Sequence, residues 1–574
     1  MNRSAKCRSS SPMTTAVAAP LALLLGLTAS VACANTPLTV TNTLDSGPGS
    51  LRQAIINANS ASGSDTIAFN IDANSDAGCN STTKVCTIKP ASLFDNITSQ
   101  LTIDGYSQTG SSPNTLLVGD DAKLLIELDA TNVSPAFRLE GPTILGSTIK
   151  GLAITHLAGV GILITDGSGN NTIAGNFIGV NVSATASSFV GTAFAVDVES
   201  ASNANTIGGT TPAARNVLSG NGTIITVSGC NNAVIQGNYI NIDKDGAVPL
   251  VAALRGIDVG AGSGNLIGSS APGAGNVIGT WAAIAIIFQG SGNNNLIQGN
   301  RIGTDATGTT LLGGGFEGVN YYEGSGTGNK IGGAAAGEGN LINGATNGDG
   351  FGLVLYFDTS PDLVVQGNLI GTDITGELPL GNLNGISAQD VSAGLIGGTA
   401  AGAGNRIAFN SSLGVSVTYS NSVVAILGND IYANGSLGIS LSGGGVPTPN
   451  DDGDADTGPN NLQNYPVITT VTVSPKTMVH VSGSLNSEAN KTYRLEFFAN
   501  ASCDSSHNGE GKIFLGHADA GTSPNDVAFG PLDFAVPADR HVITATATDP
   551  SGNTSEFSVC STQDTIFSDG FEAD

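Results

Sequence analysis

Charged and aromatic residues are scarce in this chain of 574 residues. Charged residues make up 11% and aromatic residues 5%, with a single Trp and five His. Only 20 Lys and Arg stand against 46 Asp and Glu, which gives a formal net charge of −26. A chain so poor in cations lacks the basic surface that neutralises phosphate groups. We therefore expect no nucleic-acid partner and no attachment to anionic membrane surfaces.

Cysteine spacings typical of zinc sites are also missing, because the sequence holds no C-x-x-C and no H-x-x-x-H pair. The spacing of the other cysteines in an exported chain predicts the disulfides Cys79–Cys86 and Cys503–Cys560. Cys230 is left over and follows an apolar run, so we expect it to be a packed thiol rather than a nucleophile.

Residues 1–34 have the features of an export signal. Three basic residues precede an apolar stretch over 16–27, and Ala32-Cys33-Ala34 offers a cleavage site. Cleavage would remove three basic and no acidic residues, shifting the net charge from −26 to −29. The expected product is secreted or held at the cell surface. Two alternatives stay open: an uncleaved membrane anchor, and a lipoprotein attached through Cys33, although Ser30 stands where Leu is usual.

No later stretch of the chain is long and apolar enough to span a membrane. We therefore expect no transmembrane segment in the mature chain.

Glycine and asparagine, by contrast, are abundant and regularly placed. Gly accounts for 80 residues without the Gly-x-y period of collagen. One series of nine asparagines recurs between residues 176 and 429, each followed by one variable residue and then Ile or Leu, and eight of the nine follow Gly. The nine are Asn176, Asn216, Asn238, Asn276, Asn300, Asn340, Asn368, Asn405 and Asn429. A motif that recurs in this way along the chain is typical of a repeat array.

Each repeat holds three strands of three or four residues, as in 256–259, 265–268 and 276–279. Gly and Asn between the strands suit the positive-φ corners that sharp bends require. This pattern predicts an all-β, right-handed parallel β-helix over 146–445, with the asparagines stacked at one corner. We assign those asparagines a structural role.

Residues 35–145 are expected to form an N-terminal cap and the first coils. Ser50 to Gln53 reads as a capping box, and Leu51, Ala54, Ile55 and Ala58 would form one apolar face of a short helix. Such a helix can cover the open end of the solenoid, whose backbone groups would otherwise lie unpaired.

Several segments together resemble a family of secreted bacterial right-handed β-helix proteins. They are the run from Thr39 to Ile55, Thr102 to Gln108, the Gly-Thr-Asp-x-Thr-Gly loops, and Asp452 to Asn464. The resemblance covers nearly the whole mature chain. It implies the pectin-lyase-like fold and a secreted or cell-surface setting, and it implies no particular activity or active site.

Residues 446–464 form an acidic linker rich in Pro, Gly, Asp and Asn. Asp451, Asp452, Asp454 and Asp456 place alternating carboxylates on a bendable backbone, as calcium loops do. The spacing of an EF-hand is missing, so a solvated acidic linker is the alternative to a calcium site. A bound ion would stiffen the joint between two domains.

Residues 465–562 change to longer alternating runs with turn signals between them. Five such runs predict an immunoglobulin-like β-sandwich. Residues 563–574 are expected to be a flexible tail.

Candidate binding residues lie in the loops that interrupt the repeats. Asp305 and Asp373 occupy equivalent positions two coils apart, each with a turn-capping role as the alternative. The segment 316–323 places Tyr321 and Tyr322 between Glu317 and Glu323, a set of residues suited to stacking on sugar rings and binding sugar hydroxyls. Some of these side chains are expected to pack inward or at an edge.

Two functions remain open at this point. The first is a secreted or cell-surface protein that binds extracellular polysaccharide or a cell surface without catalysis. The alternative is a polysaccharide lyase, epimerase or glycoside hydrolase, which requires a compact group of ionisable residues brought together from distant coils. The sequence alone identifies no catalytic residue.

Overall fold

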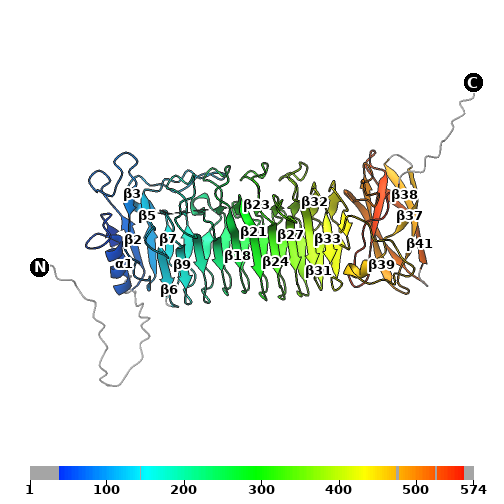
Figure 1. Cartoon of the computed structure of the whole chain (residues 1–574), viewed down its shortest axis with the longest axis horizontal. Coiled ribbons are helices and arrows are strands. Elements are labelled where there is room, and N and C mark those ends of the chain that lie inside the picture. Colours follow the sequence, from blue (N-terminus) through cyan, green and yellow to red (C-terminus); the bar gives the residue numbers. More distant parts are fainter. Residues whose placement is uncertain (1–37, 62, 143, 474–476, 524–525, 562–574) are drawn as a thin grey trace, which may run out of the picture. The chain divides into compact units, whose positions relative to one another are not determined.

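The computed structural model describes residues 38–561, except 62, 143, 474–476 and 524–525. The predicted export signal and the C-terminal tail lie outside the described residues. Most of the described chain winds into coils of three short strands, and equivalent strands of successive coils pair in parallel (Figure 1). Three long parallel sheets result, here named A, B and C. This is the predicted right-handed parallel β-helix.

The bounds of the strands follow in sheet order. Sheet A holds β1 (Leu38–Val40), β2 (Asp65–Phe69), β4 (Leu101–Asp104), β7 (Thr148–Lys150), β10 (Thr172–Ala174), β13 (Thr206–Gly208), β16 (Val234–Gln236), β19 (Leu266–Gly268), β22 (Leu296–Gln298), β25 (Lys330–Gly332), β28 (Leu363–Gln366), β31 (Gly394–Gly397) and β34 (Val424–Leu427). Sheet B holds β3 (Cys86–Ile88), β5 (Ile126–Asp129), β8 (Leu152–Thr155), β11 (Phe177–Ile178), β14 (Val217–Leu218), β17 (Tyr239–Ile240), β20 (Val277–Ile278), β23 (Arg301–Ile302), β26 (Leu341–Ile342), β29 (Leu369–Ile370), β32 (Arg406–Ala408) and β35 (Asp430–Tyr432). Sheet C holds β6 (Phe137–Glu140), β9 (Val160–Thr165), β12 (Phe194–Val198), β15 (Thr223–Val227), β18 (Ala253–Val259), β21 (Trp281–Gln289), β24 (Glu317–Tyr322), β27 (Phe351–Tyr356), β30 (Asn384–Gln389), β33 (Val415–Thr418) and β36 (Ile439–Ser440).

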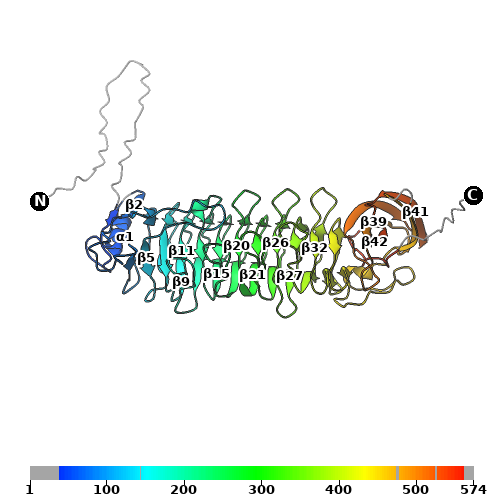
Figure 2. The same ribbon diagram turned by 90° about the horizontal axis from the view of Figure 1, so that it is seen from above.

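One apolar core runs through the inside of the coils. Inward residues stack in register from strand to strand, as Ile257, Ile286 and Val319 do in sheet C. Trp281 is buried in this core, as is the free thiol of Cys230, so both are packing residues. Loops project on the sheet B side of the solenoid (Figure 2).

The nine predicted asparagines form one continuous buried ladder. Each side-chain amide donates to the Oδ1 atom of the asparagine in the next coil, at 2.9 to 3.3 Å, from Asn176 through to Asn429. The same amide groups also bond to backbone carbonyls, as Asn300 does to Ile267. The Gly before Asn300 has φ +67°, and a Cβ there would meet the carbonyl oxygen of Ser269 at 2.4 Å. These contacts support the structural role of the asparagines.

Sheet C departs from simple alternation at a recurring glycine. In β18, the side chains of Arg255 and Asp258 both stay outside while Ile257 points inward, and the register with β21 shifts between Ala253 and Arg255. The equivalent Gly318 sits in the same position in β24, where a Cβ would lie 2.5 Å from the carbonyl oxygen of Gly352. Only a residue without a side chain allows the coils to approach this closely.

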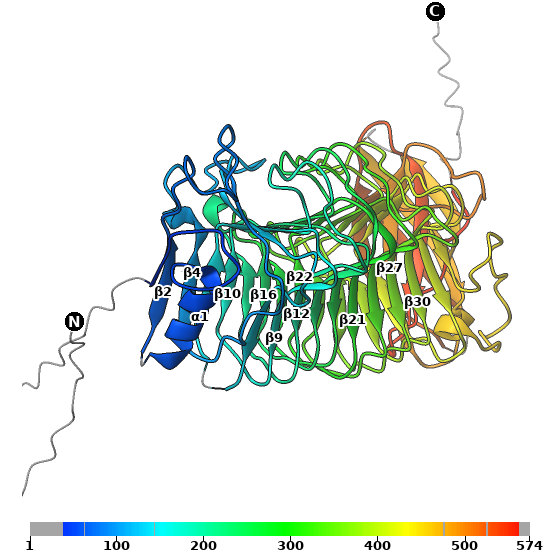
Figure 3. The ribbon, with the colours of Figure 1, turned by 60° about the vertical axis from the view of Figure 1, so that its left-hand side comes forward.

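Helix α1 (Leu51–Ser60) covers the first coil (Figure 3). Its N-cap is Ser50, whose Oγ accepts the backbone N–H of Gln53, and its buried residues are the four predicted from the sequence. The other helical segments are the short 3-10 turns η1 (Gly105–Ser107), η2 (Pro212–Ala214) and η3 (Pro459–Leu462). Among the described residues, no helix has the length and hydrophobicity needed to cross a membrane.

The C-terminal region forms two three-stranded antiparallel sheets that face each other, which fits the predicted sandwich. One sheet has the order β37 (Val467–Val473), β38 (Met478–Asn486) and β41 (Asp526–Ala535), and the other β40 (Ile513–Gly521), β39 (Thr492–Asn500) and β42 (Val542–Thr548). Strand β41 is an addition to the five predicted runs. Both predicted disulfides, Cys79–Cys86 and Cys503–Cys560, are formed.

Side chains of the C-terminal region close the last coil of the β-helix. Glu510 accepts the backbone N–H groups of Ala433 and Asn434, and Glu556 accepts that of Leu441. Other edge groups bond to Asn460, Glu496 and Thr554. Phe498 and Phe557 belong to the core of the solenoid. The sandwich is therefore the C-terminal cap of the β-helix.

Candidate functional site

The outer face of sheet C carries two adjoining hollows, which together we call the sheet C groove. The first has a volume of about 580 Å³ and the second about 550 Å³, and Gln389 lines both. The first is lined by Arg255, Ile284, Ile287, Gln289, Glu317, Asn320, Tyr322, Val354, Tyr356 and Gln389. The second is lined by Asp349, Phe351, Leu383, Asn384, Ser387, Gln389, Ser412, Leu413, Ser416, Thr418, Tyr419 and Gly443. The groove thus extends from β18 to β33 along the solenoid axis.

The length of the groove follows from strand spacing. Strands β18, β21, β24, β27, β30 and β33 are successive neighbours in sheet C. At about 4.8 Å per strand, the five intervals span roughly 24 Å. A groove of this length suits an extended chain better than a single small molecule.

A small charged group lies at the β18 end of the groove. The Arg255 Nη1 atom lies 2.5 Å from Asp258 Oδ2, and Gln289 Nε2 donates to Asp258 Oδ1 at 3.1 Å. On β24, Asn320 Nδ2 donates to Glu317 Oε2 at 2.5 Å. Arg255 and Glu317 are in register with Ile284 of the strand between them, so their backbones lie about 10 Å apart.

The local environment favours the protonated form of Glu317. Burial raises the pKa of this carboxyl group above its ordinary value, while the hydrogen bond from Asn320 and the charge of Arg255 act in the opposite direction. Asp258, in contrast, lies beside the groove and is paired with Arg255 and Gln289, two residues that line it. One end of the groove therefore holds one carboxyl group whose pKa is raised by burial and one that is paired with a cation.

Beyond this charged group, Tyr322, Tyr356 and Tyr419 line the groove, and Phe357 lies between Tyr356 and Tyr419. The rings of Tyr322 and Tyr356 stack at 5.5 Å, Tyr356 and Phe357 lie 4.1 Å apart, and Phe357 and Tyr419 lie 6.3 Å apart. We call these four residues the aromatic row. The row follows β24, β27 and β33, and its four side chains are half-buried or exposed, so a ligand can reach them.

The structure separates the residues predicted in the segment 316–323. Glu317 and Tyr322 line the groove. The prediction of Tyr321 as a binding residue is wrong, because its side chain is buried in the core, stacks on Phe288 and bonds to Asn329. Glu323 lies at an exposed corner with φ +51° and bonds to the Tyr322 hydroxyl, which raises the pKa of Tyr322.

Asp305 and Asp373 cap their own loops. Asp305 Oδ1 accepts the backbone N–H groups of Thr309 and Thr310, and Asp373 Oδ1 accepts those of Glu377 and Leu378. Hydrogen bonds from neighbouring Thr and backbone groups lower the pKa of both against the opposing effect of burial. Both loops lie between sheets B and C, and neither residue lines the groove. The turn-capping alternative describes them better than a binding role.

Sequence reasoning missed Arg255, Asp258 and Tyr356. Strict alternation in β18 would point Arg255 inward with Ile257 and Val259, whereas its side chain lines the groove on the outer face. A glycine followed by an apolar residue recurs at Gly256, Gly318, Gly352 and Gly385. That repeated pair is the signal that identifies the residues on either side as lying on the outer face of sheet C.

A second candidate site lies in the acidic linker. Carboxylate oxygens of Asp451, Asp454 and Asp456 come within 4.8 Å of one another, whereas Asp452 lies outside this group and bonds to Asn486. Burial, with the charges of the other two carboxylates, raises the pKa of Asp454 to about 6. Asp456 Oδ1 is buried and lacks a hydrogen-bond partner. Oxygen ligands of this kind fit Ca²⁺.

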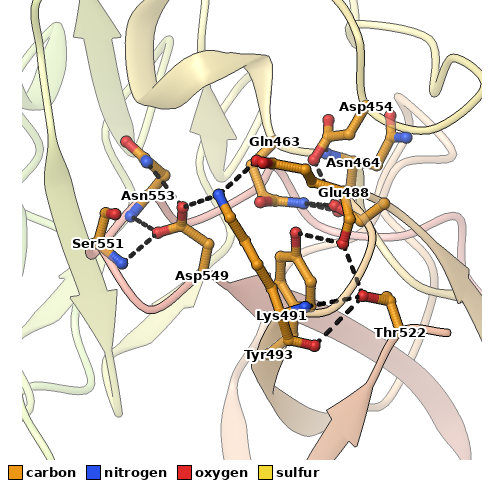
Figure 4. A network of polar contacts seen from close by, with 11 residues as sticks. Asp454, Gln463, Asn464, Glu488, Lys491, Tyr493, Thr522, Asp549, Ser551 and Asn553 are labelled. Carbon is orange, nitrogen blue, oxygen red and sulfur yellow. Dashed lines mark hydrogen bonds and ion pairs between the residues drawn. The ribbon is translucent and has the colours of Figure 1, made fainter. Parts of the chain in front are cut away.

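Hydrogen bonds attach the linker to the sandwich. Asp454 accepts from the Ser487 hydroxyl and from the backbone of Asn464. Figure 4 shows Asp454 and Asn464 beside the network of Lys491, which lies between Glu488 and Asp549. The acidic group is therefore held at the joint between solenoid and sandwich.

Comparisons of the sequence with protein families and with curated proteins give no match. Comparison of the structure gives matches of low identity to solved β-helix proteins. Tailspike protein 2 of Escherichia coli O157:H7 bacteriophage CAB120 is 10% identical over 90% of this chain and 66% of its own, with a TM-score of 0.28. The chain thus spans slightly less than two thirds of that tailspike.

Two further matches are enzymes by their descriptions. The A-module of a mannuronan C-5 epimerase from Azotobacter vinelandii is 13% identical over 72% of this chain and all of its own, with a TM-score of 0.33. The catalytic domain of a GH87 alpha-1,3-glucanase is 11% identical over 71% and 66%, with a TM-score of 0.19. The sheets described above establish the β-helix independently of these likenesses.

Proposed function

We propose that this protein binds an extended polysaccharide outside the cell in the sheet C groove and hydrolyses it. The observation that carries the proposal is the pair of carboxyl groups, Glu317 and Asp258, held in different environments at one end of a long aromatic-edged groove. Glycoside hydrolysis uses two such groups, one as the acid and the other as a carboxylate. The two disulfides fit an extracellular protein.

Each residue has a defined role in this proposal. Glu317 protonates the departing glycosidic oxygen, since its buried position favours the protonated form. Asp258 activates the attacking water, and Arg255 and Gln289 orient its carboxylate. The strands that carry the two carboxyl groups are two intervals, or about 10 Å, apart. Along the strands, Asp258 is in register with Asn320, which lies three positions beyond Glu317.

The test is to incubate the mature protein with a panel of soluble polysaccharides and measure new reducing ends and chain length. We expect Glu317→Gln to lower the cleavage rate by at least about 100-fold, the usual contribution of a general acid. The control is Asp197→Asn, which removes another carboxyl group of raised pKa on the outer face of sheet C that does not line the groove. It should cleave at the rate of the unmodified protein.

Binding without catalysis is the second candidate function, and the aromatic row is the observation that favours it. In that case the protein retains a polysaccharide without shortening it, and Glu317→Gln leaves retention unchanged. Equal cleavage by the unmodified protein and Glu317→Gln would contradict the assigned role of Glu317.

We also propose that the carboxylates of Asp451, Asp454 and Asp456 bind calcium and stiffen the joint between the solenoid and the sandwich. The support is their convergence, with the buried, unpartnered Asp456 Oδ1 atom among them. Calcium at 100 times its Kd should stabilise the folded protein by about 2.7 kcal/mol. Thermal unfolding with and without calcium measures this gain. Asp454→Asn should abolish it, and Asp452→Asn, outside the group, should keep it.

A further inference from the structure

We infer that the sheet C groove selects an uncharged polysaccharide, laid along the solenoid axis against the aromatic row, and excludes chains rich in uronic acids. This inference rests on the proposed function and adds the chemical class of the substrate. It also separates hydrolysis from the lyase and epimerase alternatives, because those reactions need a cation beside a uronate carboxylate.

The charged residues around the groove disfavour an acidic ligand. Among the described residues that line it, Arg255 is the single cation, and its guanidinium is already paired with Asp258. Glu317 and Asp349 line the same groove as carboxyl groups. A uronate would therefore meet acidic groups and no free positive partner, which disfavours its binding.

Most of the remaining residues that line the groove are polar and uncharged. The second hollow presents neutral donors and acceptors, including Asn384, Ser387, Gln389, Ser416 and Thr418. These groups exchange hydrogen bonds with sugar hydroxyls without requiring a charge on the ligand. Uncharged lining over several strands suits a polymer whose repeating units are neutral.

The aromatic row runs along the solenoid axis. Its rings succeed one another along the axis, from Tyr322 and Tyr356 to Phe357 and Tyr419. Ring faces pack against the apolar C–H face of a sugar and are insensitive to which hydroxyls it carries. The row therefore sets the direction of the chain, with the Glu317 and Asp258 pair at one end of the bound segment.

The experiment compares retention of the full mature protein on neutral polymers (a glucan, a galactan and a mannan) and on uronate polymers (polygalacturonate and alginate). We expect at least one neutral polymer to bind at least about tenfold more tightly than either uronate polymer at low salt. Phe357→Ala should weaken neutral-polymer binding by about tenfold. Phe514→Ala should leave it unchanged, because Phe514 has the same 37% exposure as Phe357 but lies on the sandwich.

Asp258→Asn should increase binding to uronate polymers, in contrast to the loss of binding expected for Phe357→Ala. It removes one negative charge and leaves Arg255 as a free cation, so retention on polygalacturonate should rise by about tenfold at low salt and fall again as salt screens the interaction. This gain of binding cannot result from misfolding.

The outcomes distinguish selectivity for neutral polymers from polysaccharide binding and cleavage as such. Uronate polymers that bind or are cleaved as well as neutral ones would overturn the inference and leave the groove as a polysaccharide site. Neutral binding that Phe357→Ala does not alter would overturn the role of the aromatic row. If the protein neither retains nor cleaves any of the polymers, the proposed function fails, and the inference fails with it.

Discussion

At the scale of single residues, the outer face of sheet C depends on where one glycine interrupts each strand. The residues on either side of each Gly-apolar pair lie on the outer face, so Arg255 and Asp258 meet outside the solenoid although they lie three positions apart. Glu317 and Asn320 repeat the arrangement two strands away. The candidate site is thus a product of repeated local geometry.

The pH dependence of cleavage tests the proposed acid. Glu317 acts in its protonated form, so the rate should fall as pH rises through its raised pKa. Arg255→Gln removes a positive charge that lowers this pKa and leaves Asp258 as an unpaired negative charge. Both changes favour the protonated form of Glu317. The pH at which kcat/KM falls on the alkaline side should therefore rise by as much as about one pH unit.

The pH of this fall should be unchanged in the control variant Asp197→Asn, which leaves both Arg255 and Glu317 intact. A shift of the fall to lower pH in Arg255→Gln would contradict the assignment of Glu317 as the acid.

Part of the candidate site could be predicted from the sequence. Glu317 and Tyr322 stood out because two carboxylates flank two aromatic residues. Tyr321 was misassigned because strand alternation sends one of two adjacent tyrosines inside, and sequence composition does not say which. Arg255 was missed because alternation with the inward Ile257 and Val259 would place it inside, whereas it lies on the outer face beside Asp258. The linker carboxylates could be grouped, but only folding separates Asp452 from the other three.

At the scale of secondary structure, the asparagine ladder is the feature best predicted from the sequence. Regularly spaced asparagine and glycine residues indicate that the same bend recurs in every coil, because the same side-chain hydrogen bonds must form in each one. The cap helix was predicted equally well from Ser50 and one apolar face. Strand β41 was missed because its segment includes Gly530 and Pro531, residues that usually mark a turn.

Removing one member of the ladder should destabilise the solenoid. Asn300→Ala deletes side-chain bonds to Asn276, Asn340 and Ile267 and leaves buried backbone groups unpaired. Each unpaired group costs about 1–3 kcal/mol, so we expect a loss of roughly 3 kcal/mol or more in the free energy of unfolding. Urea unfolding followed by circular dichroism measures this loss.

Asn347→Ala provides the matched control, because this exposed asparagine makes one long side-chain bond, to the carbonyl of Gly314 at 3.3 Å. Its effect should stay within about 0.5 kcal/mol. Equal losses in the two variants would argue against the stabilising role of the ladder.

At the scale of the whole molecule, the junction between the solenoid and the sandwich is built from buried acidic side chains. Glu510 continues the hydrogen-bond column of Asn410 and Asn434 beyond the last coil. The junction could not be predicted from the sequence, because Glu510 and Asn434 are 76 residues apart and share no repeat. The described chain from β1 to β42 belongs to one compact unit.

Glu510 should make stability depend on pH. Burial raises its pKa to about 7, compared with about 4.3 for an unfolded glutamate. Its contribution is fully present below the unfolded pKa and is lost as pH rises through about 7. We expect the free energy of unfolding to fall between pH 5 and pH 8.5 by an amount on the order of 3 kcal/mol from this residue.

Glu510→Gln cannot ionise, so the fall in stability with pH should be smaller in this variant, as followed by urea unfolding at several pH values. Glu488→Gln, which changes a largely exposed glutamate of the same sandwich, should retain the full dependence. An unchanged dependence in Glu510→Gln would show that this carboxyl group does not titrate as proposed.

The cap at the far end of the solenoid also affects how the chain is made. Helix α1, which closes the first coil, is among the first segments to leave the ribosome, whereas Thr554, Glu556 and Phe557 are among the last. Until those residues emerge, the newest coil of the growing β-helix has an open edge with unpaired backbone groups, the kind of surface that recruits strands from other chains. Premature termination just before residue 554 would therefore yield a product that keeps Asn460, Glu496 and Glu510 at the last coil but leaves the backbone groups that bond to Thr554 and Glu556 permanently unpaired. Such a product should aggregate far more readily than the full-length protein.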